Sequence, residues 1–212
     1  TFERYVAPSV VEGLLADPRR VALGGERQVI TVLFADLHGF TTLSEQLPPE
    51  ELVRVLNGYL STAGQVILRY EGMLDKFLGD SVMAIFNAPL PQPDHAWRAA
   101  CAALALQRSV VVYARNLPKH HRMAFRIGLH TGEAVVGNIG TRQLMNYTAV
   151  GDTVNVAKRL QENAEGSQIL LSRSTYALIE DKIVVQPRET LVVKGRAASV
   201  EVFELISAWE EH

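Results

Sequence analysis

The hydrophobic residues of this chain fall into short continuous runs and into longer stretches with helical spacing. Residues 29–35, Val-Ile-Thr-Val-Leu-Phe-Ala, are β-branched and aromatic for the most part, and they predict a strand that is buried on both faces. Apolar residues then recur at helical intervals over about 48–70 and again over about 94–115. These two stretches predict two long helices that follow the strand.

A predicted β-hairpin separates the two long helices. Its strands are the apolar runs 72–77 and 81–86, and the intervening Leu-Gly-Asp places Asp80 at the tip. The remaining chain predicts strands at 125–130 and 133–138 turned by Thr131-Gly132, an exposed polar excursion at 138–147, a helix at 152–164, a strand at 169–171, a helix at 172–179, and strands near 190–193 and 200–205.

The order of these elements predicts a single α+β domain with a mainly antiparallel sheet and helices on one face. We expect this domain to cover residues 28–212. Residues 1–27 carry a weaker apolar stripe that ends at Pro18 and the pair Gly24-Gly25, so they predict a lead-in or linker helix.

Composition narrows the class of protein. The chain has 212 residues, of which 48% are hydrophobic, and its net charge is −2, so nothing indicates a protein that coats nucleic acid. No run reaches the roughly 18 apolar residues of a membrane span, and the start has no signal-peptide pattern. We expect a cytoplasmic domain. Because the chain opens at Thr1 without a methionine, we also expect that a sensor or membrane-attached segment could precede it.

Two acidic turns carry the first candidate chemistry. Asp36 ends the apolar run at 29–35, Asp80 lies at the hairpin tip, and each has a glycine nearby. A strand end and a central hairpin tip can lie side by side in one sheet. Two carboxylates placed in this way could hold two divalent ions, which can clamp the attacking and leaving oxygens of a phosphoryl displacement. Taken singly, each aspartate is better explained as a turn or cap residue.

Further polar candidates surround this pair. Asn155 and Arg159 are four residues apart on the predicted helix 152–164, so they share one face and could bind a ribose oxygen and a phosphate. The alternative is an ordinary solvated helix face. Lys76, Arg126 and Lys194 are positive candidates at the ends or mouths of predicted strands, and each alone could be a surface charge.

Taken in order, four segments of the chain resemble the catalytic domain of the class III nucleotidyl cyclases, and within it the bacterial adenylate cyclases. The resemblance runs from about residue 27 to 205 and implies the palm-type, ferredoxin-like fold of a cyclase homology domain. The segments are Phe-Ala-Asp-Leu-His-Gly-Phe-Thr at 34–41, Lys-Phe-Leu-Gly-Asp at 76–80, Arg-Ile-Gly-Leu-His-Thr-Gly at 126–132 and Tyr-Thr-Ala-Val-Gly-Asp-Thr-Val-Asn at 147–155.

The resemblance implies a head-to-tail homodimer with an active site at each end of the interface. One subunit would hold two Mg²⁺ or Mn²⁺ ions through Asp36 and Asp80. The partner would bind the base of ATP through Lys76 and Thr148. The remaining implied contacts are Asn155 and Arg159 to the ribose and α-phosphate, Arg126 and Lys194 to the terminal phosphates, and Phe40 and Thr41 to substrate in the turn that follows Asp36.

The chemistry of the base supports ATP as substrate. Adenine presents an acceptor at N1, which suits the ammonium of Lys76, and a donor at its 6-amino group, which suits the hydroxyl of Thr148. Guanine presents the reverse, and guanylate-specific relatives typically have an acidic residue at the lysine position. Many relatives have aspartate where this chain has Thr148, and threonine there tends to accompany bicarbonate activation.

Two alternatives to an adenylate cyclase stay open. One is a catalytically silent cyclase-like domain that serves dimerisation or regulation, although the candidate metal, base and ribose residues are all present. The other is a guanylate cyclase. An assay of cyclic AMP with Mn²⁺ would distinguish an adenylate cyclase from the silent domain. Competition between GTP and ATP would distinguish it from a guanylate cyclase.

Overall fold

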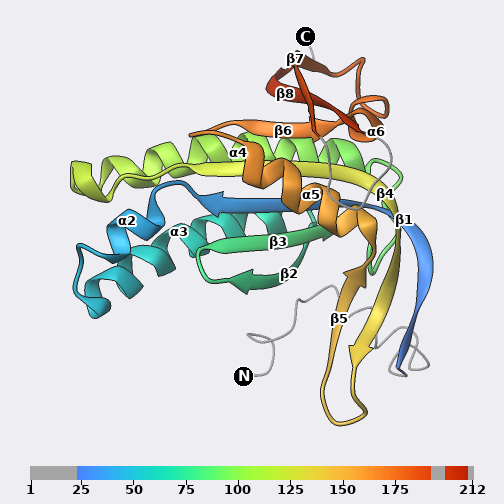
Figure 1. Cartoon of the computed structure of the whole chain (residues 1–212), viewed down its shortest axis with the longest axis horizontal. Coiled ribbons are helices and arrows are strands. Elements are labelled where there is room, and N and C mark those ends of the chain that lie inside the picture. The colour runs from blue at the N-terminus through green and yellow to red at the C-terminus, as the bar shows by residue number, and fades with distance from the viewer. Residues whose placement is uncertain (1–22, 192–198, 210–212) are drawn as a thin grey trace.

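The computed structural model describes residues 23–191 and 199–209, which form one twisted eight-stranded sheet with its helices (Figure 1). The strands are β1 (Gly24–Leu37), β2 (Met73–Leu78), β3 (Ser81–Phe86), β4 (Phe125–Gly140), β5 (Met145–Val150), β6 (Ile169–Ser172), β7 (Ile183–Leu191) and β8 (Val200–Ala208). The helices are α2 (Phe40–Ser44), α3 (Pro49–Arg69), α4 (His95–Arg115), α5 (Asp152–Asn163), α6 (Arg173–Tyr176) and the 3₁₀ turn η3 (Lys119–His121).

The sheet has the order β2-β3-β1-β4-β6-β8-β7, and β5 pairs with β4 outside this path. Every pairing is antiparallel except that of β4 with β6. The predicted α+β class and the mainly antiparallel sheet are therefore confirmed. Among residues 23–191 and 199–209, no helix has the length and apolar character needed to cross a membrane.

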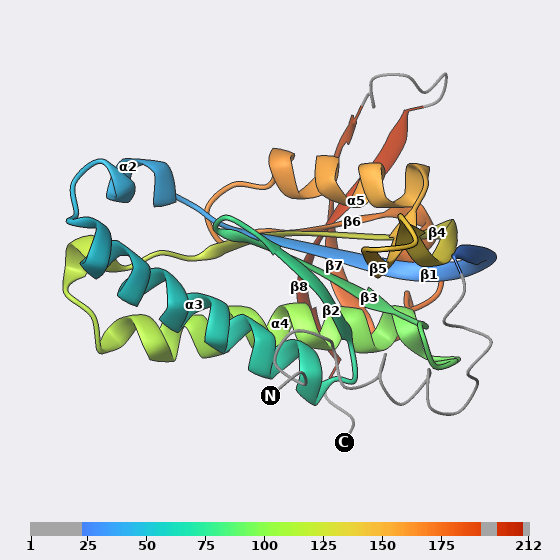
Figure 2. The same cartoon turned by 90° about the horizontal axis from the view of Figure 1, so that it is seen from below.

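The helices cover both faces of the sheet, so the prediction of helices on one face was wrong. Figure 2 shows α3 and α4 on one side and α5 on the other. Side chains of β1 explain the arrangement because they alternate between two cores. Leu33 and Ala35 pack in the core that α3 and α4 cover, whereas Val32 and Phe34 pack in a second core with Ala157 of α5.

The long strand β4 differs from its prediction as well. The expected turn at Thr131-Gly132 does not exist, because β4 continues to Gly140 and pairs with β1 along its length. The hydroxyl of Thr131 lies 2.8 Å from that of Thr31, which satisfies this polar residue inside the sheet. The segment predicted as an exposed excursion contains the end of β4 and the start of β5, and β1 begins at Gly24 rather than Val29.

Other predicted elements lie close to where the periodicity placed them. The hairpin β2–β3, the helices α3, α4 and α5 and the strand β6 match within about two residues. Helix α6 is shorter than the predicted helix at 172–179, and β7 starts earlier, at Ile183. The predicted lead-in helix lies largely outside the described residues, as does Lys194.

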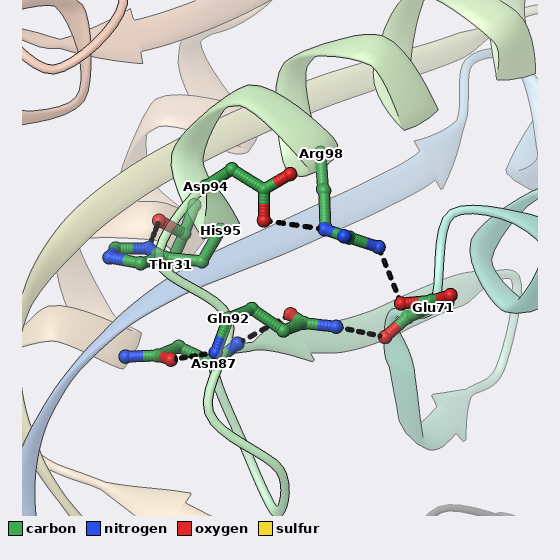
Figure 3. Close-up of polar contacts among 7 residues, drawn as sticks. All are labelled: Thr31, Glu71, Asn87, Gln92, Asp94, His95 and Arg98. Atoms are coloured by element: carbon green, nitrogen blue, oxygen red, sulfur yellow. Dashed lines mark hydrogen bonds and ion pairs between the residues drawn. The ribbon is translucent and has the colours of Figure 1, made fainter.

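A polar cluster fixes the start of α4 against its neighbours (Figure 3). Gln92 accepts a hydrogen bond from the backbone N of Asn87 at 2.8 Å and donates one to the backbone O of Glu71, also at 2.8 Å. His95, the first residue of α4, has its Nδ1 2.7 Å from the hydroxyl of Thr31 in β1. These bonds tie the loop after β3 to the end of α3 and to the central strand.

Candidate active site

The two aspartates predicted as metal ligands lie at the ends of adjacent strands. Asp36 is the penultimate residue of β1, and its neighbours in register are Ser81 on β3 and Arg126 on β4. Asp80 directly precedes Ser81 at the tip of the β2–β3 hairpin. The sheet therefore brings both carboxylates to the same end of neighbouring strands, as the sequence predicted.

Asp36 is 7% exposed, and both of its carboxylate oxygens have partners. Its Oδ1 accepts a short hydrogen bond from the hydroxyl of Ser81. Its Oδ2 accepts from Nε and Nη2 of Arg126, at 2.8 and 2.6 Å. The guanidinium of Arg126, expected on the terminal phosphates, thus pairs with Asp36.

Asp80 is half-buried, and its surroundings disfavour its charge. Burial and then the nearby charge of Asp36 raise its pKa, while the cations Arg126 and Lys158 act in the opposite direction. A divalent cation between the two carboxylates would relieve this repulsion. Mg²⁺ is commonly held by one or two carboxylates together with substrate phosphates. The described residues offer no third His, Cys, Asp or Glu here, and this donor set fits a metal that is bound jointly with a nucleotide.

The turn after Asp36 leads into the short helix α2. Gly39 has φ of 88°, which its lack of a Cβ allows, and Leu43 donates to its carbonyl at 3.1 Å. Phe40 packs its ring against the core, whereas Thr41 is exposed. Phe40 can therefore offer a ligand its backbone rather than its ring, and Thr41 can offer its hydroxyl.

Lys76 and Thr148, the predicted base-binding residues, are in contact within one subunit. Nζ of Lys76 donates to Oγ1 of Thr148 at 3.3 Å, from β2 to β5. The sequence analysis missed a third member of this group, Asp75, whose Oδ2 accepts from Oγ1 of Thr148 at 2.8 Å. An acidic and a basic residue side by side in an apolar strand were the signal that could have identified it.

Helix α5 presents Asn155 and Arg159 on one exposed face, as their spacing predicted. Its buried face rests on β4 at Gly128, where a Cβ would overlap the backbone N of Gln161. Glycine at this position therefore sets the height of α5 above the sheet. Arg159 forms an ion pair with Glu162 at 2.9 Å.

Sequence reasoning also missed Lys158 of α5. Its charge acts on Asp80, and its Nζ lies 5.5 Å from the centre of the Phe34 ring. It brings a positive charge from α5 toward the carboxylates of its own subunit. A cavity of about 740 Å³ lies elsewhere, between β4, α5 and α6, and none of the predicted site residues that the structure describes lines it. Asn155 and Arg159 are exposed on the surface, whereas Asp36 and Thr148 are each only 7% exposed.

The sheet places Asp36 and Asp80 at the ends of neighbouring strands in an α+β fold. The sequence profile of the adenylate and guanylate cyclase catalytic domain matches residues 25–207. The chain therefore belongs to this family, the class III nucleotidyl cyclases. It is 35% identical over 213 residues to "Adenylate cyclase 1" of Rhizobium meliloti, a match that covers 97% of this chain and 32% of that protein. The chain thus spans about a third of this relative.

Solved structures agree on the fold but not on the base. The adenylyl cyclase CyaB from P. aeruginosa is 36% identical with a TM-score of 0.82, covering 87% of this chain and 97% of that one. The guanylyl cyclase Cya2 is also 36% identical, with a TM-score of 0.83 and coverage of 89% and 96%. Overall similarity therefore does not choose between adenine and guanine.

Proposed function

We propose that this chain is the catalytic domain of an adenylate cyclase, which converts ATP to 3′,5′-cyclic AMP and pyrophosphate. The observation that carries the proposal is the contact of Lys76 with Thr148 at 3.3 Å, in a chain whose Asp36 and Asp80 lie at the same end of the sheet. Lys76 can only donate, which suits N1 of adenine, and Thr148 can accept from the 6-amino group. A pocket built in this way rejects a mismatched base strongly, because its buried polar groups are left unpaired.

We further propose that two copies pair head to tail and form both active sites between them. One hairpin carries Lys76 and Asp80, yet base and metals lie at opposite ends of a nucleotide, so one copy cannot use both on the same ATP. A two-fold dimer lets each hairpin serve two sites. Exposed apolar side chains support such an interface: Phe77 is 45% and Leu78 48% exposed at the hairpin, and Leu144 is 74% exposed in the β4–β5 turn.

In the proposed reaction the ribose 3′-oxygen attacks the α-phosphorus in line, the bond to the β-phosphate oxygen breaks, and pyrophosphate leaves. Two Mg²⁺ or Mn²⁺ ions, held by Asp36 and Asp80, would supply charge neutralisation and ease loss of the 3′-hydroxyl proton. Asn155 of the other copy orients the ribose, and Arg159 stabilises charge that develops at the α-phosphate. The terminal phosphates are bound by Arg126, Lys194 and the turn that contains Phe40 and Thr41.

A guanylate cyclase is the second candidate, favoured by the equal identity to a guanylyl cyclase structure. Lys76 argues against it, since an ammonium cannot accept from N1–H of guanine. We also propose that bicarbonate activates this domain, because relatives with threonine at the position of Thr148 tend to respond to bicarbonate. Because the chain spans 32% of its relative, we propose an upstream sensor or membrane-attached region, with this domain in the cytoplasm beside its ATP.

Complementation between inactive variants tests the reaction and the dimer together. Asp36→Asn removes a metal ligand, and Arg159→Ala removes the α-phosphate contact, so each variant alone should make little cyclic AMP. Random mixing of the two should restore about a quarter of the unmodified rate, because about half of the dimers contain one intact site of two. Arg54→Ala, at an exposed charge of α3, is the control and should have the activity of the unmodified chain.

Rates measured over a range of protein concentrations, with ATP or GTP and with either metal, complete this experiment. The unmodified chain should lose activity on dilution as its dimer dissociates. Arg159→Ala should lower kcat more than it raises KM, as expected for a contact that strengthens in the transition state. Absence of cyclic AMP from the assembled dimer would refute the proposal. Full activity of Asp36→Asn on its own would refute the role of Asp36 as a metal ligand.

A further inference from the structure

Strand β2 contains one extra residue where it passes the base pocket. Leu74 pairs with Ala84 and Lys76 pairs with Met83, so Asp75 between them has no partner in register. Ala84 belongs to the core under α3 and α4, and Met83 belongs to the core under α5. A regular strand would turn Lys76 toward α3 and α4. The bulge instead lets Asp75 and Lys76 both reach Thr148.

Asp75 is sealed inside the protein. Its side chain is 1% exposed, and its Oδ2 lies 2.8 Å from Oγ1 of Thr148 and 3.3 Å from Nζ of Lys76. Its Oδ1 has no hydrogen-bond partner among the described residues. A buried carboxylate oxygen without a partner costs stability. The arrangement is therefore a poor way to hold the fold together, and its benefit must lie in what it does to its two neighbours.

The three polar groups allow one pattern of protons. An ammonium can only donate, and a carboxylate can only accept. Thr148 has a single hydroxyl proton, and it donates that proton to Asp75 while it accepts from Lys76. One lone pair of the hydroxyl oxygen then remains for a ligand. Thr148 is thereby fixed as an acceptor.

We propose that Asp75 is a positioning residue that determines base specificity by keeping Thr148 an acceptor toward the 6-amino group of adenine. The inference rests on the proposed function, because it names how that same site chooses its nucleotide. Guanine and hypoxanthine carry an acceptor at O6, and they would need the hydroxyl proton that Asp75 already holds. Asp75 also keeps the ammonium of Lys76 beside Thr148, so both halves of the adenine contact depend on it.

Binding of nucleotides that cannot react provides the test. The probes are the α,β-methylene analogues of ATP and of inosine triphosphate, titrated by calorimetry into the dimer of the full chain. Hypoxanthine has the N1 donor and O6 acceptor of guanine without its 2-amino group, so the ratio of the two dissociation constants reports on Thr148 and Lys76. Asp75→Ala should reduce this preference for the ATP analogue by about tenfold, the effect of one lost directional hydrogen bond.

Two further variants separate positioning from mere structure. Asp75→Asn keeps a carbonyl oxygen that can accept from Thr148, so it should retain the preference within about threefold. Thr148→Val removes the hydroxyl, and in that background Asp75→Ala should change the ratio much less than it does in the unmodified chain, because only the contact of Asp75 with Lys76 is then lost. Asp75→Leu fills the buried volume and replaces Asp75→Ala if that variant does not assemble. Thermal unfolding of each dimer shows that the compared samples are folded.

The proposal is overturned if folded Asp75→Ala keeps the full preference, or if it lowers the ratio equally when Thr148 is valine. Loss of the preference in both Asp75→Ala and Asp75→Asn would also overturn it, since charge rather than proton direction would then decide. Binding and turnover are read separately. A chain that shows the expected ratios but makes no cyclic AMP would refute the enzyme assignment and leave the role of Asp75 standing.

Discussion

Two buried aspartates of this domain each lie beside a cation, and they differ in how open they are. Asp36 pairs with Arg126, and its side chain is 9% exposed against 32% for its partner. Asp75 pairs with Lys76, and its side chain is 1% exposed. Both oxygens of Asp36 have partners, whereas Oδ1 of Asp75 has none among the described residues. Asp36 can exchange its partners for a ligand, but Asp75 can act only through its neighbours.

The largest expected contrast comes from the same substitution at both positions. Asp36→Asn removes charge from the metal site, so the rate of cyclic AMP formation should fall by about a thousandfold or more. Asp75→Asn should keep the rate within about tenfold, since it retains an acceptor for Thr148. Initial rates with saturating Mn²⁺ and ATP measure both effects. Equal losses would show that the two aspartates do not differ in role.

A substitution at Gly128 tests whether turnover depends on the close packing of α5 against β4. In Gly128→Ala the new methyl group would overlap the backbone of Gln161 and Ala157, so α5 must move away from β4. We expect a loss of about 2–3 kcal/mol in the free energy of unfolding and a fall in turnover, because α5 carries Asn155 and Arg159. The preference for ATP over inosine analogues should persist, since Asp75 and its neighbours lie on β2 and β5.

The matched control for this change is Gly64→Ala in α3, where a Cβ meets nothing within 4 Å. It should be neutral or raise stability by up to about 1 kcal/mol, because alanine favours the helix. Urea unfolding of both variants gives the comparison. If Gly128→Ala proves as stable as Gly64→Ala, the close approach of α5 to β4 is not what positions that helix.

Removing Arg126 tests whether Asp36 can exchange partners. Arg126→Ala leaves the carboxylate of Asp36 without its ion pair, and the fold should lose about 1–2 kcal/mol, since the partly exposed pair is accessible to water. Addition of Mn²⁺ without nucleotide should then stabilise this variant more than the unmodified chain, because the proposed phosphate contact of Arg126 does not enter this comparison. Unfolding temperatures with and without ligand measure the difference. Equal stabilisation of both proteins would show that Arg126 does not compete with the metal.

Much of this picture could be read from the sequence, because hydrophobic periodicity fixes local structure. Residues 30–35 of the run at 29–35 are buried on both faces as predicted, whereas Val29 is 44% exposed, and the hairpin places Asp80 beside the end of β1. The face that α5 covers could not be read, since the order of elements is the same on either side. Thr131-Gly132 indicated a turn, but Thr131 is satisfied by Thr31 and Thr175 inside a continuous strand.

The base pocket shows a second limit of sequence reasoning. Lys76 and Thr148 were predicted together from the resemblance, and the structure has them in contact. Asp75 was missed because strand alternation assigns neighbouring residues to opposite faces, and a bulge cancels that rule at one position. No periodicity marks a bulge. The role of Lys158 was hidden for a similar reason, since it depends on how α5 crosses the sheet.

The smallest expected effect is the change that Asp75 causes in the free energy of unfolding as the pH varies. Burial raises the pKa of Asp75, although its hydrogen bond from Thr148 and the charge of Lys76 oppose the rise. A carboxyl group with a raised pKa binds its proton more readily in the folded than in the unfolded chain. Stability is therefore lost as the pH rises through the folded pKa, and it is fully present below the unfolded pKa of about 4.

Asp75→Asn lacks this titration, so it should be more stable than the unmodified chain at pH 7, by a margin that shrinks as the pH falls toward about 4. Asp94 provides a control of opposite sign, because its hydrogen bond from Arg98 lowers its pKa. Asp94→Asn should be less stable than the unmodified chain at pH 7, and that deficit should also shrink in acid. Urea unfolding across this pH range measures both differences. A destabilised Asp75→Asn at pH 7 would mean that the carboxylate of Asp75 supports the fold, as that of Asp36 does, and the contrast between the two aspartates would then rest on exposure alone.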